Sequence, residues 1–427
     1  MKKVLAACII LLCCVLTSCT QQKPAALHIL LDVCGDSRSA AEAEAKMENF
    51  ITNMAYSGIP IEAEIEVMPV TGSDRKAALQ RVRTEIASGK GPDVFILSAE
   101  PRTVNAEPLF GFPECAMDDG RFLVLDELIE KAQFMEWDKL TPAVMEAGRT
   151  EDGQMLLPLT YTFPVTVFRK GEAALELSPD LTWDQVLAEG SPYLKAAAAP
   201  GSRCGSEYLS GLLGELADYP AEELLFTQEE LVQRIRETLE LAQSRDEKAF
   251  GELPDYQGFP MCVDFEYDFY PKKGDGSYAA LRPGDPVEMA PLYSVQGGCR
   301  ATIRTYGGIN RNTKRPEEAF AVLDMLLSGE VQAKGALFSQ DLLVGSVPTH
   351  EDLMREGCEV RFWSMTDENF QAYERARQQI TSAGFGNRLT NELFQLYAKC
   401  SWRMKPEDLE KQAAETYRVM QMMLAES

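Results

Sequence analysis

Three short segments near the start of the chain have the hydrophobic pattern of β-strands. The apolar run from Leu27 to Val33 predicts a buried strand. From residue 61 to 67, apolar residues alternate with glutamates, which predicts a strand with one exposed face. The apolar segment 93–97 predicts a third, buried strand.

Two helices are predicted between these strands. The first follows the capping box Ser39–Glu42 and runs to about Ala55, and the second runs from Ser73 or Asp74 to about residue 88. The resulting β-α-β-α-β series is typical of an α/β fold with a parallel sheet. Because ligands of such sheets lie beyond the carboxyl ends of the strands, loops 34–38 and 98–102 are the candidate site.

The rest of the chain continues the mixed pattern. Residues 155–168 form a long apolar stretch with two prolines, which we interpret as a crossing between lobes. The last 60 residues are predicted to be helical. Further predicted elements are helices over 182–189, 228–249 and 316–327 and a strand over 302–309.

The first 19 residues have the pattern of an export signal. Two lysines precede the apolar run Val4–Leu16, which at 13 residues is shorter than the ~20 that span a bilayer. Leu16–Cys19 resembles the lipobox of bacterial lipoproteins, which implies cleavage after residue 18 and a lipid-anchored Cys19. A polar tether over 19–26 then leads to the first strand. A plain signal peptide with a chance cysteine is the alternative.

Composition and charge narrow the function classes. The chain has 427 residues, 45% of them hydrophobic, which indicates a globular protein of two or more domains. Its net charge of −24 would repel nucleic acid and anionic lipid headgroups. No glycine-rich nucleotide-binding motif follows the first strand.

Cysteines and histidines offer little material for catalysis or metal binding. Seven cysteines remain beyond Cys19, an odd number without a C-x-x-C motif, so we expect mainly buried thiols. The two histidines, His28 and His350, are interpreted as structural. The sequence therefore disfavours a Ser-His-Asp triad and a histidine metal site, and we expect no cofactor.

Several motifs, in order along the chain, resemble those of family 1 extracellular solute-binding proteins. These are the receptors of ATP-driven importers, and the maltose-binding protein is a familiar relative. Arg169–Gly171 departs from the family pattern. The matching segments are Gly89–Val94, Leu125–Ile129, Gly153–Leu159, Thr182–Gln185, Tyr306–Lys314, Pro316–Phe320 and Gln332.

The resemblance implies a two-lobed fold of the periplasmic-binding-protein type II class. Each lobe would be a mostly parallel sheet flanked by helices, and two or three hinge crossings would join the lobes. Residues 27–160 and 291–345 would form the first lobe. Residues 161–290 and 346–427 would form the second.

The resemblance also implies a function. A monomeric, lipid-anchored receptor on the outer face of the cytoplasmic membrane, extracellular or periplasmic, would bind a solute in the interlobe cleft. Hinge closure would follow, and the closed form would dock on the permease subunits of an ABC transporter. We expect a mono- or oligosaccharide as ligand and no enzymatic activity.

Polar candidates for ligand binding lie in the two predicted cleft loops. Ser98 and Glu100 follow the third strand, and a solvated loop acid is an equally good interpretation of Glu100. Asp36 and Arg38 follow the first strand, where helix capping or a surface ion pair is favoured over ligand contact.

Aromatic candidates come from the crossings and the last segment, because sugar rings stack on aromatic side chains. Tyr161 and Phe163 alternate along the first crossing and should face the same side, with core packing slightly favoured over a cleft wall. Tyr306 precedes two glycines that allow close backbone approach. For Trp363, ligand contact and core burial are equally plausible.

One segment keeps other functions open. As a strand, Asp264–Tyr270 would place three acids on one face and three aromatics on the other. Acids with that spacing suit calcium, a cationic ligand or a glycosidase, although a charged edge strand is the favoured interpretation. The alternatives are therefore an extracellular carboxylate-dependent glycosidase, or a receptor for a peptide, a polyamine or a metal.

Overall fold

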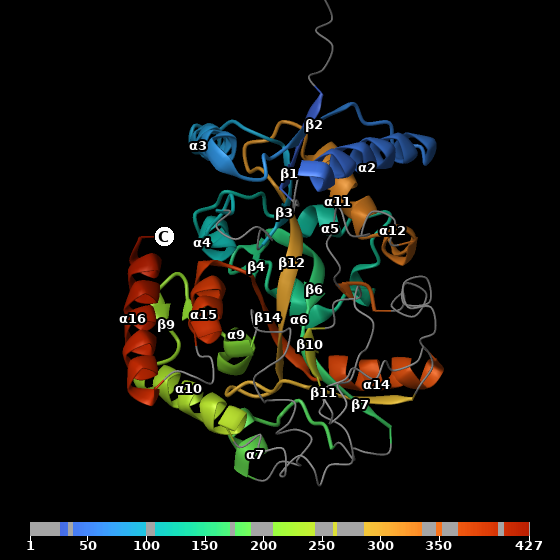
Figure 1. Cartoon of the computed structure of the whole chain (residues 1–427). Helices are drawn as coiled ribbons and strands as arrows, with labels where there is room; N and C mark the ends of the chain where they lie inside the picture. Colours follow the sequence, from blue (N-terminus) through green and yellow to red (C-terminus); the bar gives the residue numbers. More distant parts are fainter. Residues whose placement is uncertain are drawn as a thin grey trace, which may run out of the picture.

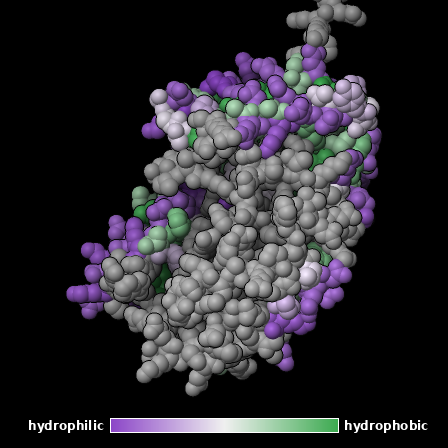
Figure 2. All heavy atoms as spheres, turned by 45° about the vertical axis from the view of Figure 1, so that its right-hand side comes forward, coloured by the Kyte–Doolittle hydropathy of each residue, from purple (hydrophilic) through white to green (hydrophobic). Residues whose placement is uncertain are grey.

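The computed structural model describes residues 26–32, 37–99, 107–170, 176–188, 208–243, 259–262, 286–334, 347–351, 366–399 and 405–426. Figure 1 shows a large sheet with helices on both sides and a smaller sheet below it. None of the helices in these ranges is both long and apolar enough to span a membrane. On the face shown in Figure 2, hydrophilic side chains cover most of the described surface.

The large sheet has seven strands in the order β13-β6-β12-β3-β1-β2, with β14 beside β12. Strands β2 and β3 run parallel to β1, whereas β12 runs antiparallel to β3 and β6 and parallel to β14. The strands are β1 (Leu27–Asp32), β2 (Ala63–Val67), β3 (Val94–Ser98), β6 (Leu156–Thr162), β12 (Cys299–Ile309), β13 (Val347–Pro348) and β14 (Ile380–Phe385).

Helices cover both faces of the parallel part of this sheet. Successive side chains of a strand point to opposite faces, so the apolar residues of β1 need a covering layer on each side. Ile29 of β1 packs with Leu31 against one group of helices, whereas Leu30 packs on the opposite side. The first group contains α2 (Ser37–Tyr56) and α11 (Pro316–Leu326), and the second contains α3 (Gly72–Ala87) and α4 (Pro113–Asp118).

Short elements connect the helices to the sheet. A buried carboxylate, Asp324 of α11, accepts hydrogen bonds from the backbone N–H groups of residues 133–135, so this loop is fixed to the helix. The short elements are α5 (Asp126–Ile129), the 3₁₀ helix η1 (Trp137–Lys139), α6 (Pro142–Glu146), β4 (Arg149–Thr150), β5 (Gly153–Gln154) and α12 (Gly329–Lys334).

The smaller sheet is antiparallel in its described part, with the order β10-β7-β11. A separate hydrophobic cluster lies beside it, built on the buried Trp183, Tyr208 and Tyr293. The elements are β7 (Pro164–Arg169), α7 (Trp183–Ala188), α9 (Tyr208–Leu213), β8 (Ala217–Asp218), β9 (Glu223–Leu224), α10 (Gln228–Gln243), β10 (Phe259–Cys262), β11 (Val287–Pro291), α14 (Asp367–Arg377), α15 (Arg388–Lys399) and α16 (Pro406–Ala425).

Most predicted elements are confirmed. The β-α-β-α-β series is present, and the apolar stretch 155–168 forms β6 in the large sheet and β7 in the small one. The capping box at α7 is formed: the backbone N–H of Thr182 donates to Gln185, and the N–H of Gln185 donates back to the Thr182 hydroxyl.

The prediction of a wholly helical C-terminal segment is wrong at β14. Residues 380–385 form a strand that pairs in parallel with the first half of β12. The segment contains Thr381, Ser382 and Gly384, which favour a helix poorly, and the adjacent edge of β12 supplies hydrogen-bond partners for an extended backbone. Tertiary pairing therefore decides the conformation here.

Candidate functional site

The candidate site is the edge of the large sheet where the parallel strands β1 and β3 end. Asp32 is the last residue of β1 and is paired in register with Leu97 of β3. Ser98, the last residue of β3, is half-buried and faces Thr305 across the β3–β12 pair. We call this place the carboxyl edge, and ligands of α/β sheets bind at such edges.

A buried ion pair lies at the carboxyl edge. Arg75, near the start of α3, donates from its two terminal nitrogens to the two carboxylate oxygens of Asp32, at 3.0 and 2.8 Å. Both side chains are only 5% exposed. Burial raises the pKa of Asp32, and the hydrogen bonds and charge of Arg75 act against this rise. The bidentate geometry fixes the orientation of both side chains, and each buried charge is compensated by the charge of the other.

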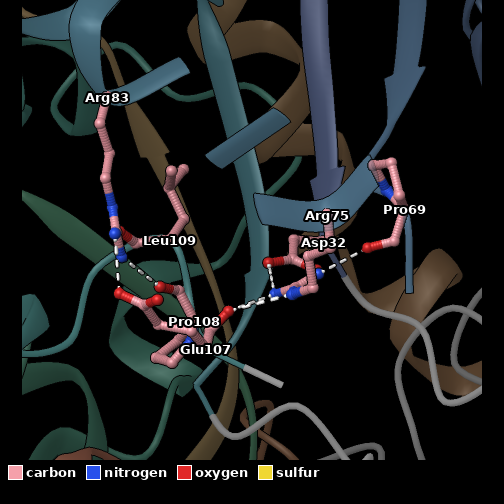
Figure 3. A network of polar contacts seen from close by, with 7 residues as sticks. All are labelled: Asp32, Pro69, Arg75, Arg83, Glu107, Pro108 and Leu109. Atoms are coloured by element: carbon pink, nitrogen blue, oxygen red, sulfur yellow. Dashed lines mark hydrogen bonds and ion pairs between the residues drawn. The ribbon is translucent and has the colours of Figure 1, made fainter. Parts of the chain in front are cut away.

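Arg75 also binds two backbone carbonyls near the edge (Figure 3). Its guanidinium donates to the Pro69 oxygen at 2.9 Å and twice to the Glu107 oxygen, at 3.0 and 2.7 Å. An arginine has five N–H donors, and all five are used in these bonds and the bonds to Asp32. Arg75 therefore builds the edge and has no donor left for an anionic ligand.

A second arginine extends this framework along the segment that follows residue 106. Arg83 of α3 donates to the backbone oxygens of Leu109 and Pro108, at 3.0 and 2.8 Å, and to the Glu107 carboxylate at 2.7 Å. Figure 3 shows both arginines holding this segment against α3. Together they fix the end of β1, the segment after β2 and the segment that leads into α4.

The structure describes only part of the predicted polar site. Ser98 lies at the carboxyl edge, as expected from its position after an apolar strand. Arg38 lies in α2, and its side chain is outside the described set. Asp36, Glu100 and Trp363 are outside the described residues, as are Cys19 and the segment Asp264–Tyr270. Ligand contacts of these residues stay a prediction.

The three remaining aromatic candidates are buried in the core. Tyr161 and Phe163 lie on the same side with their rings stacked at 6.4 Å, and Phe163 also packs on Tyr373 of α14 at 5.7 Å. Tyr306 packs edge-on against Phe385 at 5.0 Å. Burial raises the pKa of the Tyr161 and Tyr306 hydroxyls. These rings join strands of the large sheet to each other and to α14, and their contact with a ligand stays a prediction.

A hydrogen-bonded cluster reinforces this junction between the two sheets. Arg377 of α14 is buried and donates to Glu374 of the same helix, at 3.0 and 2.9 Å, and to Glu351 at 2.8 Å. Because Glu351 follows β13, the cluster links α14 to an edge of the large sheet. These polar contacts add to the apolar packing of Phe163 on Tyr373 at the same junction.

Sequence reasoning missed Asp32 and Arg75. The only signal was an acid at the end of an otherwise apolar strand, since a buried acid requires a partner. Both histidines contact a glutamate: His28 Nε2 lies 3.0 Å from Glu66, and His350 Nε2 lies 3.2 Å from Glu136. Within the described residues, no group of three or more His, Cys, Asp or Glu side chains could hold a metal ion.

Comparisons with known proteins show the fold. No protein-family model and no curated protein matches the sequence. The sugar-binding protein MalE from Xanthomonas citri has a similar structure, at 12% identity and a TM-score of 0.57, over 94% of this chain and 98% of that one. A family 1 extracellular solute-binding protein from Alicyclobacillus acidocaldarius matches at 14% identity and a TM-score of 0.56, with the same coverage.

The chain therefore has the two-lobed α/β fold of extracellular solute-binding proteins of ABC transporters, which confirms the predicted fold class. A de novo designed cysteine esterase is also similar, at 15% identity and a TM-score of 0.57, over 94% of this chain and 98% of that one. The fold is thus compatible with designed chemistry as well as with binding.

Proposed function

We propose that the chain is the solute-binding receptor of an ATP-driven importer and that its solute is a mono- or oligosaccharide. The observation that carries the proposal is the similarity of fold over 94% of the chain to solute-binding proteins, among them a sugar-binding one. The order of the sequence motifs supports the same function. The protein would bind its solute without changing it.

The ligand would lie at the carboxyl edge, between a lobe of residues 27–160 and 291–345 and a lobe of residues 161–290 and 346–427. Ser98, Asp36, Arg38 and Glu100 would supply polar contacts. The fully used donors of Arg75 favour a neutral ligand, because this buried arginine at the edge offers nothing to an anion. Hinge closure would then bring the second lobe onto the ligand.

Cys19 would carry the lipid that holds the receptor beside its permease on the outer face of the membrane. Its position after the apolar run Val4–Leu16 supports export and attachment of the chain to the outer face of the membrane. Two acyl chains give stable anchoring where one gives only reversible binding. Labelling with a fatty-acid analogue in a bacterial host should mark the wild-type chain and leave Cys19→Ala unmarked; equal labelling of both would refute the anchor.

A thermal-shift panel of neutral mono- and oligosaccharides tests the proposed ligand class. At a concentration of about a hundred times Kd, a ligand stabilises the folded state by about 2.7 kcal/mol, so one or more saccharides should raise the melting temperature saturably. The saccharide should be recovered intact. The glycosidase alternative would replace this proposal if a glycoside is hydrolysed and the activity is lost in Glu266→Gln or Asp268→Asn.

A further inference from the structure

A polar pocket lies between α4, the turn from α6 to β4, the segment from α9 to β8, and strands β12 and β14. Its volume is about 320 Å³, in the range of small-molecule sites. We call it the α4–β14 pocket. Among the described residues, five acids and two arginines line it: Glu114, Asp118, Glu146, Glu151, Glu215, Arg149 and Arg300.

Arg300 is the buried cation of this pocket. It is only 4% exposed, and it follows a β-bulge between Cys299 and Arg300 that changes the register of β12 against β14. The guanidinium packs directly on Gly384, where a Cβ atom would lie 1.9 Å from Nη2. Its Nη1 is inaccessible to solvent and has no hydrogen-bond partner among the described residues. A buried donor of this kind is unusual in a native protein.

Glu114, in the first turn of α4, is the complementary acid. Its Oε1 accepts from the Asn387 amide at 3.3 Å, and the same nitrogen lies 2.6 Å from the Tyr219 hydroxyl. Its Oε2 is inaccessible and, like Arg300 Nη1, has no partner among the described residues. Burial raises the pKa of Glu114 to about 7, although a hydrogen bond with its own backbone, the charge of Arg300, and hydrogen bonds with Asn387 and Tyr219 act against this rise.

The other arginine of the pocket is already engaged. Arg149 donates to the Asp126 carboxylate at 3.1 Å and lies 3.7 Å from Glu146. A purely anionic ligand could therefore accept a hydrogen bond from Arg300 but would be repelled by the acids of the pocket. A purely cationic ligand would leave Arg300 without a hydrogen-bond acceptor. A ligand with a cation at one end and an anion at the other satisfies both groups.

We propose that the α4–β14 pocket binds a small zwitterion of the α-amino acid class, with its carboxylate on the Arg300 guanidinium and its ammonium group on the Glu114 carboxylate, after small side-chain rotations that turn the inaccessible Nη1 and Oε2 atoms toward the ligand. Residues of both proposed lobes line this pocket, but none of the described residues proposed to contact the saccharide is among them. Phe385, Met117 and Leu216 give the pocket an apolar part against which an amino acid side chain can pack.

Isothermal titration of the full mature chain with glycine, alanine and glutamine at pH 7 tests the proposal. We expect saturable one-to-one binding of at least one of them. Because Glu114 is about half protonated near its pKa of about 7 and must be ionised to hold the ammonium group, binding should release about half a proton. Buffers with different ionisation heats measure this release.

Variants separate the two ends of the site. Arg300→Gln and Glu114→Gln should each weaken binding at least tenfold, and Glu114→Gln should also abolish the proton release. Arg149→Gln makes the same charge change in the same pocket as Arg300→Gln but should alter affinity less than threefold, since Arg149 is paired with Asp126. Circular dichroism checks that each variant is folded.

Three results would overturn the proposal. The first is no heat of binding from any of the three amino acids. The second is unchanged affinity in a folded Arg300→Gln or Glu114→Gln chain. The third is equally tight binding of acetate or methylamine, which carry one end of the zwitterion only. Saccharide binding, measured on the same preparation, shows independently whether the proposed receptor function holds.

Discussion

Two regions of this protein place an arginine near an acid, which is buried in one case and half-buried in the other, and they differ in how completely the two groups are hydrogen-bonded. At the carboxyl edge, Arg75 uses all five N–H donors on Asp32 and two backbone carbonyls. In the α4–β14 pocket, Arg300 Nη1 and Glu114 Oε2 are both inaccessible and without a partner among the described residues. The same two residue types are thus fully hydrogen-bonded at the carboxyl edge, whereas in the α4–β14 pocket they keep polar atoms without a partner, where we propose that a ligand binds.

The two arginines therefore differ in whether their N–H donors have hydrogen-bond partners, and this difference distinguishes a structural arginine from one that can bind a ligand. A fully bonded arginine cannot gain from a ligand, because every ligand bond would replace an existing one. An arginine with an unmet buried donor gains when a ligand supplies the acceptor. The two arginines should therefore respond in opposite ways to substitution: one through folding stability, the other through binding.

Substitution of Arg75 should have the strongest effect on stability. Arg75→Met leaves Asp32 buried without its partner, and breaking such a pair costs about 3–5 kcal/mol of unfolding free energy. Urea denaturation measures the loss. Arg83→Met is the matched control on the same helix, and its ion pair is 37% and 59% exposed, so a loss near ~1 kcal/mol is expected. Equal losses in the two variants would contradict the distinction.

Glu114 should cause the next strongest effect, a dependence of stability on pH. Its ordinary pKa of 4.5 rises to about 7 on folding, so between these pH values the folded chain keeps a proton that the unfolded chain releases. The free energy of unfolding should therefore fall as pH rises from about 4.5 to 7, by about 3 kcal/mol at most. Glu114→Gln should remove this slope in denaturation curves, and an unchanged slope would show that another group causes it.

Gly384 should show a more moderate effect, which tests the packing of Arg300. In Gly384→Ala the new Cβ would collide with the guanidinium, and overpacking of this kind costs about 1–3 kcal/mol. Adding Arg300→Gln should recover part of the loss, and a double-mutant cycle measures the coupling. Strictly additive losses would mean that Arg300 does not rest on Gly384.

His28, whose side chain is partly exposed at the large sheet, should show the weakest effect. Its hydrogen bond with Glu66 raises its pKa, so the pair stabilises the fold below about 6.5, and this stabilisation is lost as pH rises through the raised pKa. The side chains are 26% and 25% exposed, which limits the effect to under about 1 kcal/mol. His28→Asn should flatten this part of the pH profile, whereas Glu64→Gln should leave most of it.

The elements whose signal is local could be predicted from the sequence. Apolar runs and period-two alternation located β1, β2 and β3, and the reciprocal bonds of Thr182 and Gln185 confirm a cap that two residues specify. Strand β14 was missed because its conformation depends on β12, which is far away in the chain. Local patterns cannot report such a partner.

The candidate site was predictable in position but not in bonding. The end of β3 and Ser98 follow from the rule on parallel sheets. The Asp32–Arg75 pair required α3 to return beside the end of β1, and the α4–β14 pocket required five separate segments to meet. Nothing in the spacing of these residues along the chain indicates either arrangement.

A sequential calorimetric titration can decide whether the molecule separates a saccharide cleft from an amino acid pocket. The full mature chain receives a saccharide that stabilises it and then an amino acid, and Arg300→Gln is treated in the same way. We predict two distinguishable one-to-one events in the wild-type chain and loss of only the second in the variant. This separation would be contradicted if Arg300→Gln left the amino acid event intact, or abolished saccharide binding while remaining folded.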